Sequence, residues 1–329
     1  MEFKDFTAGK DDQDRRLDRV LRIFLKEKGL PEIYKLLRKG LIKLNHKKAS
    51  PETHVMAGDI ISIAAFLFVK ENDDSFIKNQ LNKNAALKIV FENDDLLIID
   101  KDYDRSVHGK SDGIYKDVLE YLSAEKSNLE ASLSFKPGPL HRLDRRTTGL
   151  LVFSKSLKGA HWFTEAIKKH IVQKKYFGLA EGKLLQKEIW TDYIRDSGEN
   201  AQGFYTVKAE NSNQKQDDSL RCETIANPIA YGNVGDKFFT LIEYEIKTGR
   251  KHQIRSQSAL HKHPLAGDTA YDGHSLRDIG NPSREFYLQA YFLTFPKENP
   301  LGLPSQIKIN LSSDFIEQLQ CCGIKKLGL

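Results

Sequence analysis

The stretch from residue 137 to residue 153 limits the structures open to this chain more than any other. It opens with a turn signal, Pro137-Gly138-Pro139, and ends in the apolar run Leu150 to Phe153, which is short enough to be a buried strand. Between them lie three arginines and one carboxylate, Asp144. A carboxylate held before a buried strand among fixed positive charges stays ionised, which suits a nucleophile or a base. The arginines suit a polyanion, and an ion-paired turn residue is the alternative interpretation of Asp144.

The size and composition of the chain fit a protein of two domains. It has 329 residues, of which 40% are hydrophobic and 29% charged, and a net charge of +6 that permits an anionic partner without requiring one. Its three cysteines, Cys222, Cys321 and Cys322, are too few for a disulfide framework, which favours a cytoplasmic location. No apolar run reaches membrane-spanning length, and residues 1–6 lack the apolar core of a signal peptide.

The first part of the chain predicts a small module with two helices. Leu17 to Phe24 shows helical spacing of apolar residues, and Ile33 to Leu37 begins a second such pattern that Gly40 ends as a C-terminal cap. Short strands are expected around residues 42–45 and 59–63.

Positive charge dominates the middle of this module. Six cations occur with no acidic residue between Glu32 and Glu52, namely Lys35, Arg38, Lys39, Lys43, Lys47 and Lys48. A solvated helix face usually mixes the two signs of charge, so this run favours nucleic-acid binding. The module has a helix, a turn, the stretch Leu37-Arg38-Lys39-Gly40-Leu41-Ile42-Lys43-Leu44-Asn45 and a later Ala57-Gly58-Asp59-Ile60. In this order it resembles the S-four-type RNA-binding domain, and we assign it residues 14–68. A polar stretch rich in Asn and Lys, residues 69–86, follows as a linker.

Residues 87–329 predict a second domain with many strands and few helices. Its clearest strands are a hairpin over 87–100, the run 172–182 that carries Tyr176, and the run 238–246. Helices are expected over 115–124 and 160–171. Tyr176 could stack on a base or move a proton, although an ordinary strand tyrosine is the alternative.

A turn and a helix start are expected after residue 246. Arg250, Lys251 and Arg255 near that start could bind an anion, and a solvated basic face is the alternative. The same region holds four potential metal ligands, but their spacing fits no known zinc pattern and the nearby cations disfavour a metal. They are His252, His261, His263 and Asp268. We therefore expect no metal and no cofactor.

Three blocks then occur in order along the chain. They are His141-Arg142-Leu143-Asp144-x-x-Thr147-Thr148-Gly149, Lys174-x-Tyr176, and Thr248-Gly249-Arg250-x-His252-Gln253-Ile254-Arg255 with Gly267-Asp268-x-x-Tyr271. Together they resemble the RluA-type pseudouridine synthases over residues 14 to 310. The basic module makes the chain similar to the subgroup that acts on large-subunit (23S) ribosomal RNA.

The resemblance implies a fold, a reaction and residue roles. The fold is α+β, with a mixed, mainly antiparallel central sheet. The reaction isomerises uridine to pseudouridine, with Asp144 as the catalytic aspartate and Arg255 as its ion-pair partner. Tyr176 is implied to lie against the uracil and help the carbon-5 proton leave, and Arg142 to fill the gap left by the flipped nucleotide. The cations expected to contact RNA are Arg142, Arg145, Arg250, Lys35, Arg38, Lys39 and Lys43. RNA is the expected partner of a monomeric protein.

Two departures from the family pattern are visible. The family usually has Lys-Pro-x-Gly where this chain has Lys101-Asp102-Tyr103-Asp104, which puts the shape of the RNA entry loop in question. A common Leu-His-Ala is replaced by Leu288-Gln289-Ala290. Neither departure touches the three blocks.

Other classes of function fit the sequence less well. The His-Arg-Leu-Asp order differs from the kinase catalytic loop, and no phosphate-covering glycine loop accompanies it. A glycosidase-like hydrolase needs a second catalytic carboxylate, which the blocks lack. A non-catalytic RNA-binding ribosome assembly factor would need no carboxylate in a basic cleft. Transfer RNA remains open as an alternative substrate to ribosomal RNA.

Overall fold

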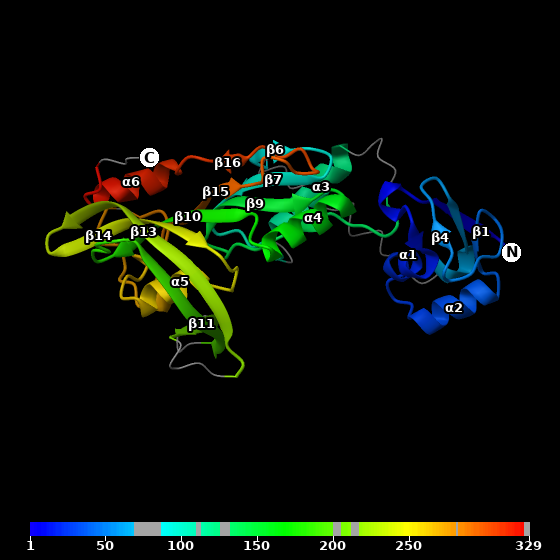
Figure 1. Cartoon of the computed structure of the whole chain (residues 1–329), viewed down its shortest axis with the longest axis horizontal. Coiled ribbons are helices and arrows are strands. Elements are labelled where there is room, and N and C mark those ends of the chain that lie inside the picture. Colours follow the sequence, from blue (N-terminus) through cyan, green and yellow to red (C-terminus); the bar gives the residue numbers. More distant parts are fainter. Residues whose placement is uncertain are drawn as a thin grey trace. The chain divides into compact units, whose positions relative to one another are not determined.

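The computed structural model divides the described chain into two compact units. The N-terminal unit comprises Met1–Leu87, Val118–Gly138 and Ser154–Ala160, and the large unit comprises Lys88–Asp117, Pro139–Phe153 and His161–Leu329 (Figure 1). The residues that the structure describes are 1–68, 87–109, 113–125, 132–199, 205–211, 217–280 and 282–325. The predicted linker, residues 69–86, lies outside them, so its boundaries stay a prediction.

The N-terminal unit contains the two predicted helices on a small sheet. Helix α1 spans Leu17–Phe24 and α2 spans Leu30–Arg38, and Gly40 follows α2 with a φ of +67° as the predicted cap. Leu17, Leu21, Ile33 and Ile61 are fully buried in the core of this unit. The strands are β1 (Phe3–Thr7), β2 (Arg15–Arg16), β3 (Ile42–Leu44), β4 (His54–Val55) and β5 (Ile60–Ala64), with β1-β5-β3 as one sheet and β2-β4 as another. The folded unit therefore begins before residue 14.

A segment from much later in the chain completes the N-terminal unit. The buried carboxylate of Asp12 accepts hydrogen bonds from the backbone N–H groups of Leu133 and Ser134 (both 2.9 Å) and from the Ser134 hydroxyl. Arg15 donates to the Ser134 carbonyl at 3.0 Å. Residues 132–134 are thus held by the N-terminal unit shortly before the chain enters the block around Asp144.

The basic segment, which we define as the six cations from Lys35 to Lys48 named above, lies on α2, on β3 and in the turn after β3. All but Lys43 are exposed. The Lys43 ammonium lies 4.4 Å from the centre of the Phe3 ring. Within the described residues no carboxylate forms an ion pair with any of the six. Their charge is therefore available to a polyanion.

The large unit is organised by an eleven-stranded sheet in the order β12-β11-β13-β14-β10-β15-β9-β7-β6, with β8 and β16 paired at its side. Strand β15 pairs with β9 in parallel, whereas β10 pairs antiparallel with both β14 and β15. The predicted mixed, mainly antiparallel sheet and α+β class are confirmed. The strand bounds are β6 Ile89–Glu92, β7 Leu96–Lys101, β8 Gly138–Pro139, β9 Thr148–Ser154, β10 Gln173–Glu181, β11 Glu188–Glu199, β12 Tyr205–Glu210, β13 Leu220–Val234, β14 Lys237–Ile246, β15 Leu288–Thr294 and β16 Gln306–Lys308.

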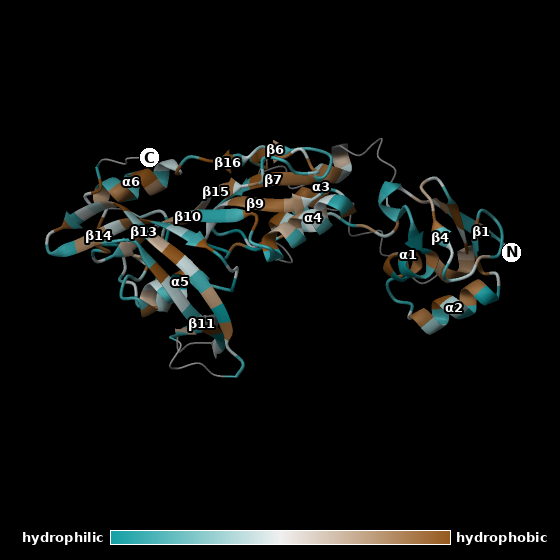
Figure 2. Cartoon of the chain, in the orientation of Figure 1, coloured by the Kyte–Doolittle hydropathy of each residue, from teal (hydrophilic) through white to brown (hydrophobic). Residues whose placement is uncertain are grey.

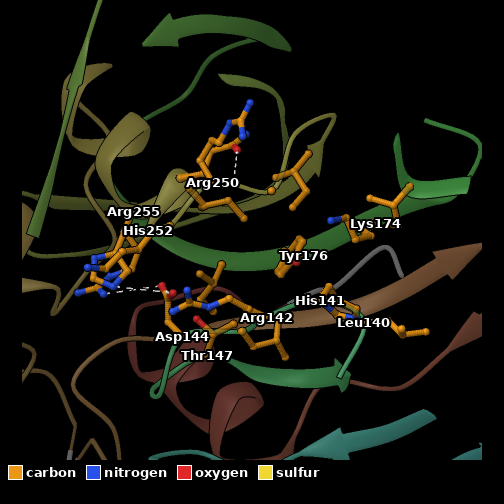
Figure 3. Close-up of a pocket in the computed structure, with 18 residues that line it drawn as sticks. Leu140, His141, Arg142, Asp144, Thr147, Lys174, Tyr176, Arg250, His252 and Arg255 are labelled. Atoms are coloured by element: carbon orange, nitrogen blue, oxygen red, sulfur yellow. Dashed lines mark hydrogen bonds and ion pairs between the residues drawn. The ribbon is translucent and has the colours of Figure 1, made fainter. Parts of the chain in front are cut away.

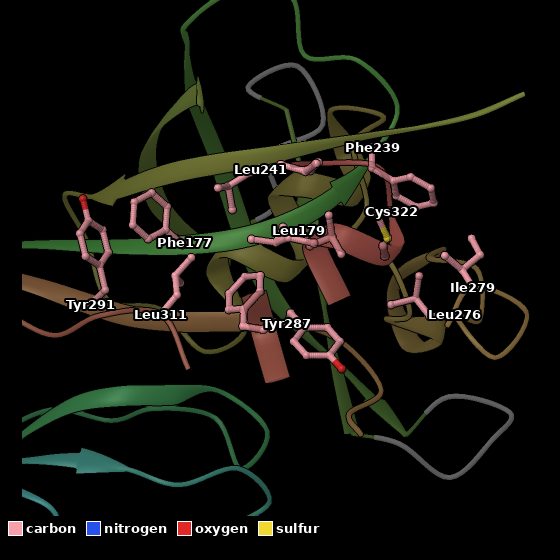
Figure 4. Packing of buried hydrophobic residues seen from close by; sticks show 14 residues of the cluster. Phe177, Leu179, Phe239, Leu241, Leu276, Ile279, Tyr287, Tyr291, Leu311 and Cys322 are labelled. Carbon is pink, nitrogen blue, oxygen red and sulfur yellow. The ribbon is translucent and has the colours of Figure 1, made fainter. Parts of the chain in front are cut away.

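Apolar side chains pack between this sheet and short helices. Phe177, Leu241, Tyr291 and Phe315 belong to one buried cluster that joins β10, β14 and β15 to the terminal helix α6 (Ser313–Cys321) (Figure 4). Strands β7 and β9 are apolar along most of their length (Figure 2), as the run ending at Phe153 predicted. The helices are α3 Ile114–Glu125, α4 Leu157–Lys168, α5 Gln253–Leu260 and α6 Ser313–Cys321. No helix in the described part of the chain is long and apolar enough to cross a bilayer.

Candidate active site

A cavity of about 330 Å³ in the large unit brings the three sequence blocks together. Asp144 lies in the turn ahead of β9, Tyr176 lies on β10, and Arg255 lies in the first turn of α5. All three side chains line the cavity, together with Arg142 and Arg250 (Figure 3). We call this cavity the active-site pocket.

The turn that carries Asp144 is fixed by a close approach between two strands. Gly149 on β9 is opposite Ala290 on β15, and a Cβ at Gly149 would lie 2.1 Å from the Ala290 carbonyl oxygen. Only glycine fits there, and its φ of +104° is also one that other residues rarely adopt. The N–H of Thr147 donates to the carbonyl of Asp144 at 3.1 Å. The Thr-Thr-Gly that follows Asp144 thus sets where its carboxylate lies.

Arg255 is held by a second carboxylate and two aromatic rings. Its Nε and Nη2 donate to Asp268 Oδ2 and Oδ1 at 2.7 and 2.8 Å, a bidentate pair. The guanidinium carbon lies 4.7 Å from the ring centres of both Tyr271 and Phe286. Burial acts to lower the pKa of Arg255, but the Asp268 hydrogen bonds outweigh it and raise the pKa above its ordinary value. The remaining nitrogen, Nη1, lies 3.8 Å from Asp144 Oδ2.

The predicted ion pair between Arg255 and Asp144 is therefore present, but it is the longer of two. Arg255 is already neutralised by Asp268, so it fixes the position of Asp144 without binding it tightly. That leaves the Asp144 carboxylate free to meet a substrate.

His252 lies on the other side of the Asp144 carboxylate. Its Nε2 is 3.8 Å from Asp144 Oδ1, and its Nδ1 is 2.7 Å from the Tyr271 hydroxyl. Burial lowers the pKa of His252, with Asp144 acting in the opposite direction, so the ring is neutral at pH 7. The Tyr271 oxygen accepts the Val207 N–H at 2.9 Å. The hydroxyl hydrogen then needs an acceptor, and assigning that role to Nδ1 places the imidazole hydrogen on Nε2, facing Asp144.

Tyr176 supplies an aromatic face to the same pocket. Its side chain is 5% exposed. Burial, and next the negative charge of Asp144, raise the pKa of the hydroxyl well above its ordinary value. The phenol is therefore neutral at pH 7, and the side chain can stack on a base or hydrogen-bond to it.

Lys101, which this chain shares with the family pattern Lys-Pro-x-Gly, begins the stretch 101–104 that departs from it. Its fully buried ammonium donates to the carbonyls of Asp102, Arg105 and Arg145 at 3.0, 2.8 and 2.9 Å. Burial lowers the pKa of Lys101 to about 7, with Asp144 opposing that shift. Arg145 directly follows Asp144 in the chain, so this hydrogen bond from Lys101 anchors the turn that carries Asp144.

The two acids beside Lys101 are held by ion pairs. Asp102 pairs with Lys88 at 2.7 Å, and Asp104 pairs with Arg145 at 2.9 Å. The Tyr103 hydroxyl accepts the Glu285 N–H at 2.9 Å. Charged contacts thus replace the rigid proline turn of the family pattern.

The cations predicted to contact RNA divide into two groups. Arg142 and Arg250 line the active-site pocket with exposed side chains, and Arg145 lies in its surface ion pair with Asp104. Such an exposed pair contributes only about 0–1 kcal/mol, so Arg145 can exchange its partner. The other group is Lys35, Arg38, Lys39 and Lys43 of the basic segment, which belongs to the N-terminal unit.

The four potential metal ligands lie in four different environments. His252 contacts Tyr271 and Asp268 holds Arg255, as described above. His261 Nε2 lies 2.9 Å from the Asp192 carboxylate, and His263 Nδ1 lies 3.2 Å from the Glu181 carbonyl. Among the described residues no His, Cys, Asp and Glu side chains gather as a metal cluster.

Sequence reasoning missed the roles of Lys101 and Tyr271 and assigned Asp268 only as a potential metal ligand. The block Gly267-Asp268-x-x-Tyr271 did contain the signal for two of them. Asp268 and Tyr271 lie within one short turn, which ends in the 3-10 helix Thr269–Tyr271, and both reach the residues that flank Asp144.

Comparisons with known proteins identify the family of this chain. Residues 95–260 match the family described as RNA pseudouridylate synthase. The chain is 31% identical over 303 residues to ribosomal large subunit pseudouridine synthase C of Haemophilus influenzae, covering 88% of this chain and 84% of the relative. It is 30% identical over 299 residues to the protein of the same name from Escherichia coli K12, covering 87% of this chain and 86% of the relative.

Solved structures share the fold. The human RNA pseudouridylate synthase domain containing 4 protein superposes with a TM-score of 0.57 at 21% identity, covering 73% of this chain and 94% of that one. The human RNA pseudouridylate synthase domain containing 1 protein superposes with a TM-score of 0.55 at 22% identity, covering 74% of this chain and 90% of that one. The matched family, the length of the shared sequence and the common fold agree, and the chain belongs to the RNA pseudouridylate synthases.

Proposed function

We propose that this enzyme converts specific uridines of large-subunit (23S) ribosomal RNA to pseudouridine. The bacterial relatives reported above carry the large ribosomal subunit in their names. The basic segment, with its unpaired cations, supports a structured RNA as the substrate. Transfer RNA is the competing substrate, and the experiment below separates the two.

The observation that carries the proposal is the position of Asp144. Its carboxylate lies between a permanently charged Arg255 and the N–H of a neutral His252, at the edge of a pocket of about 330 Å³. A uridine stacked in an RNA helix cannot reach such a pocket, so the nucleotide must be flipped out first. We propose that Asp144 begins the reaction in which the bond from ribose to N1 breaks and the bond from ribose to C5 forms.

The neighbouring residues have supporting roles in this proposal. Tyr176 stacks on the uracil, and its neutral hydroxyl hydrogen-bonds to the base and holds it while the C5 proton is lost to water, after the ribose has been joined to C5. Arg142, exposed at the rim, occupies the space that the flipped nucleotide leaves. Arg255 positions Asp144. The basic segment contributes affinity for the RNA backbone, and we propose that the enzyme works as a monomer in the cytoplasm.

Tritium release tests the proposal directly, because pseudouridine formation replaces the hydrogen at C5 of the target uracil. Wild type and Asp144→Asn are given RNA labelled at C5, with large-subunit, small-subunit and transfer RNA as separate, protein-free substrates. We expect release from large-subunit RNA by wild type, and at least about a thousandfold less with Asp144→Asn. RNA binding by Asp144→Asn should match wild type, which shows that the variant is folded.

Two outcomes would contradict the proposal. Release from transfer RNA alone would move the substrate to that class. Release by Asp144→Asn at the wild-type rate would remove Asp144 from the chemistry. Assembly intermediates of the large subunit should be included as a further substrate, so that a target uridine that reacts only in a partly assembled subunit is also tested.

A further inference from the structure

Lys174 is a buried cation that the site described so far does not use. It precedes Tyr176 by two residues on β10, so the two side chains lie on the same face of the strand. Lys174 is 8% exposed, and among the described residues it has neither a hydrogen-bond acceptor nor a carboxylate. Burial is the only cause that lowers its pKa, to about 8. The side chain is therefore mostly buried, and its ammonium borders the cavities described below without a partner from the described residues, which is unusual in a folded protein.

The neighbouring Lys175 has the ion-pair partner that Lys174 lacks among the described residues. Lys175 points to the opposite face of β10, where its ammonium forms a 2.8 Å ion pair with Glu243. It also lies 5.8 Å from the centre of the Phe292 ring. The two consecutive lysines therefore lie on opposite faces of one strand, and Lys175 has a carboxylate partner within the protein whereas Lys174 has none among the described residues.

Lys174 lies where two cavities meet. It lines the active-site pocket and also a second cavity of about 330 Å³. The second cavity has a mostly basic lining that includes Lys168, Lys247 and Arg250, of which Lys168 pairs with Glu165 at 2.8 Å. Its carboxylate, Glu245, already pairs with Lys247. Figure 3 shows Lys174 toward the end of the active-site pocket that is remote from Arg255 and His252.

The space between the Lys174 ammonium and residue 249 is open because residue 249 is a glycine. The Lys174 ammonium, at 3.3 Å, is the one heavy atom within 4 Å of a Cβ built at Gly249 that lies outside its immediate chain neighbours. Any side chain at residue 249 would therefore begin directly over the charge. The junction between the two cavities is consequently polar, positively charged and accessible to a ligand.

We propose that Lys174 binds the phosphodiester that joins the flipped uridine to its neighbouring nucleotide, and that the second cavity receives that neighbour. This inference rests on the proposed function, because it takes RNA as the ligand. A phosphodiester carries one negative charge at every physiological pH and compensates a buried ammonium. A uracil carbonyl could also accept a hydrogen bond, but it would leave the charge of Lys174 without a counter-ion.

Two variants that each remove one positive charge test this assignment. Lys174→Met keeps the unbranched shape of the side chain in the pocket, one heavy atom shorter, and Lys175→Met is the control with the same change on the opposite face. Both are made in wild type for kinetics and in Asp144→Asn for binding, so that binding is measured without turnover. The probe is protein-free large-subunit ribosomal RNA, titrated at several KCl concentrations.

We expect Lys174→Met to weaken RNA binding about tenfold or more, since a hydrogen bond to a charged group is lost. The slope of log K against log salt concentration should fall by about 0.7–0.9, the value for one phosphate contact. In the active background KM should rise by a similar factor while kcat changes less. Lys175→Met should change affinity by less than about twofold.

Three results would overturn the assignment. Equal loss of affinity in both variants would mean that only general charge matters. Unchanged affinity and salt slope in Lys174→Met, with kcat lost, would place Lys174 on the base instead of the phosphate. A lower melting temperature for RNA-free Lys174→Met would reveal a structural partner, because removing an unpaired buried charge should leave the protein equally or more stable.

The binding measurement also separates this inference from the proposed function. If wild type converts no RNA but Lys174→Met still loses affinity and its salt slope falls by the amount expected for one phosphate contact, the proposed reaction fails and the phosphate site stands. If wild type converts RNA and Lys174→Met binds and reacts as wild type does, the phosphate site fails and the reaction stands.

Discussion

The basic segment and the active-site pocket both concentrate positive charge, but they hold it in opposite ways. In the basic segment, Lys35, Arg38 and Lys39 are exposed on or just after one helix, and none of them has an acidic partner among the described residues. In the pocket, the guanidinium of Arg255 is buried, bound by Asp268 and packed between two rings.

This difference suits the two groups of cations to two tasks, which are affinity for an RNA backbone and the positioning of the Asp144 carboxylate. Exposed, unpaired cations attract a phosphate backbone through counter-ion release, which depends on salt and little on sequence. A buried and paired cation has no net charge to offer, and it serves to fix the direction of a neighbouring carboxylate. The comparison predicts that changes in the basic segment alter binding, whereas changes around Arg255 alter stability and turnover.

Removal of the carboxylate behind Arg255 should have the largest effect. Asp268→Asn leaves a buried guanidinium with a neutral partner, and we expect a loss of about 3–5 kcal/mol in the free energy of unfolding. Tritium release should fall at least about a hundredfold, because Arg255 would turn toward Asp144 and neutralise it. Urea denaturation and tritium release measure the two effects.

The control for this prediction is Asp272→Asn, four residues along the chain. Asp272 is exposed and has a φ of +60°, a conformation that asparagine also tolerates. It should unfold and react as wild type does. If Asp268→Asn were as stable and active as this control, the buried pair would have no part in holding the site.

Neutralisation of three cations in the basic segment should have the second-largest effect, which is on RNA affinity. The triple variant Lys35→Gln, Arg38→Gln, Lys39→Gln should bind ribosomal RNA about a hundredfold more weakly, and its salt slope should fall by about 2–3. The melting temperature and the rate at saturating RNA should stay at their wild-type values. Nitrocellulose filter binding at several salt concentrations gives affinity and slope together.

A matched triple variant in the large unit removes the same charge elsewhere. Lys187→Gln, Lys237→Gln, Lys297→Gln changes three exposed lysines outside the basic segment. A similar loss of affinity in this variant would show that total charge, and not the basic segment, controls RNA binding.

Much of this division could be predicted from the sequence, because the signals are local. The apolar run before Phe153 gave a buried strand, and the run of cations without acids marked the basic segment. The three blocks contained Asp144, Tyr176 and Arg255, which do meet at one pocket. Short motifs indicate which residues belong together when each block carries its own turn or strand.

The contacts that hold the site could not be predicted, because they join residues far apart in the chain. Lys101 reaches the carbonyl of Arg145, 44 residues later, and Asp12 binds Ser134 across 122 residues. A buried lysine that binds three carbonyls looks like any other lysine in a sequence. The sequence also indicated Asp144 as the partner of Arg255, whereas the tighter partner is Asp268, since bidentate geometry depends on how α5 meets the following turn.

Removal of the hydroxyl that binds His252 tests the position of the imidazole and should have a smaller effect on turnover. Tyr271→Phe removes the group that links the Val207 N–H to His252 Nδ1. We expect kcat to fall about tenfold through a misplaced imidazole, with KM unchanged and stability reduced by about 1 kcal/mol. The control Tyr231→Phe also loses one hydroxyl, which donates to the Leu184 carbonyl at 2.7 Å away from the pocket. Equal kcat values in the two variants would separate Tyr271 from the site.

The smallest expected effect near neutral pH is on the free energy of unfolding, and it comes from two histidines of the pocket that stay neutral in the folded protein. Burial, and next the charge of Lys174, lower the pKa of His141 to about 3, and burial lowers the pKa of His252. His141 Nε2 accepts the Val152 N–H at 3.2 Å, and its Nδ1 is buried. Both rings therefore resist protonation in the folded state.

The sign of the pH dependence follows from linkage. Below about pH 6.5, the ordinary pKa of histidine, the unfolded chain takes up a proton at His141 that the folded chain refuses until about pH 3. The stability is thus fully present above pH 6.5 and falls as the pH is lowered, by up to about 1.4 kcal/mol per pH unit for each such histidine. In His141→Gln, whose amide can still accept the Val152 N–H, one of these contributions is absent. Urea denaturation at pH 7, 6 and 5 should therefore show a shallower loss for this variant than for wild type. Parallel curves of stability against pH would mean that His141 takes up its proton in the folded protein. His141 would then carry a positive charge below about pH 6.5, and the pocket would resemble the basic segment more closely than we propose.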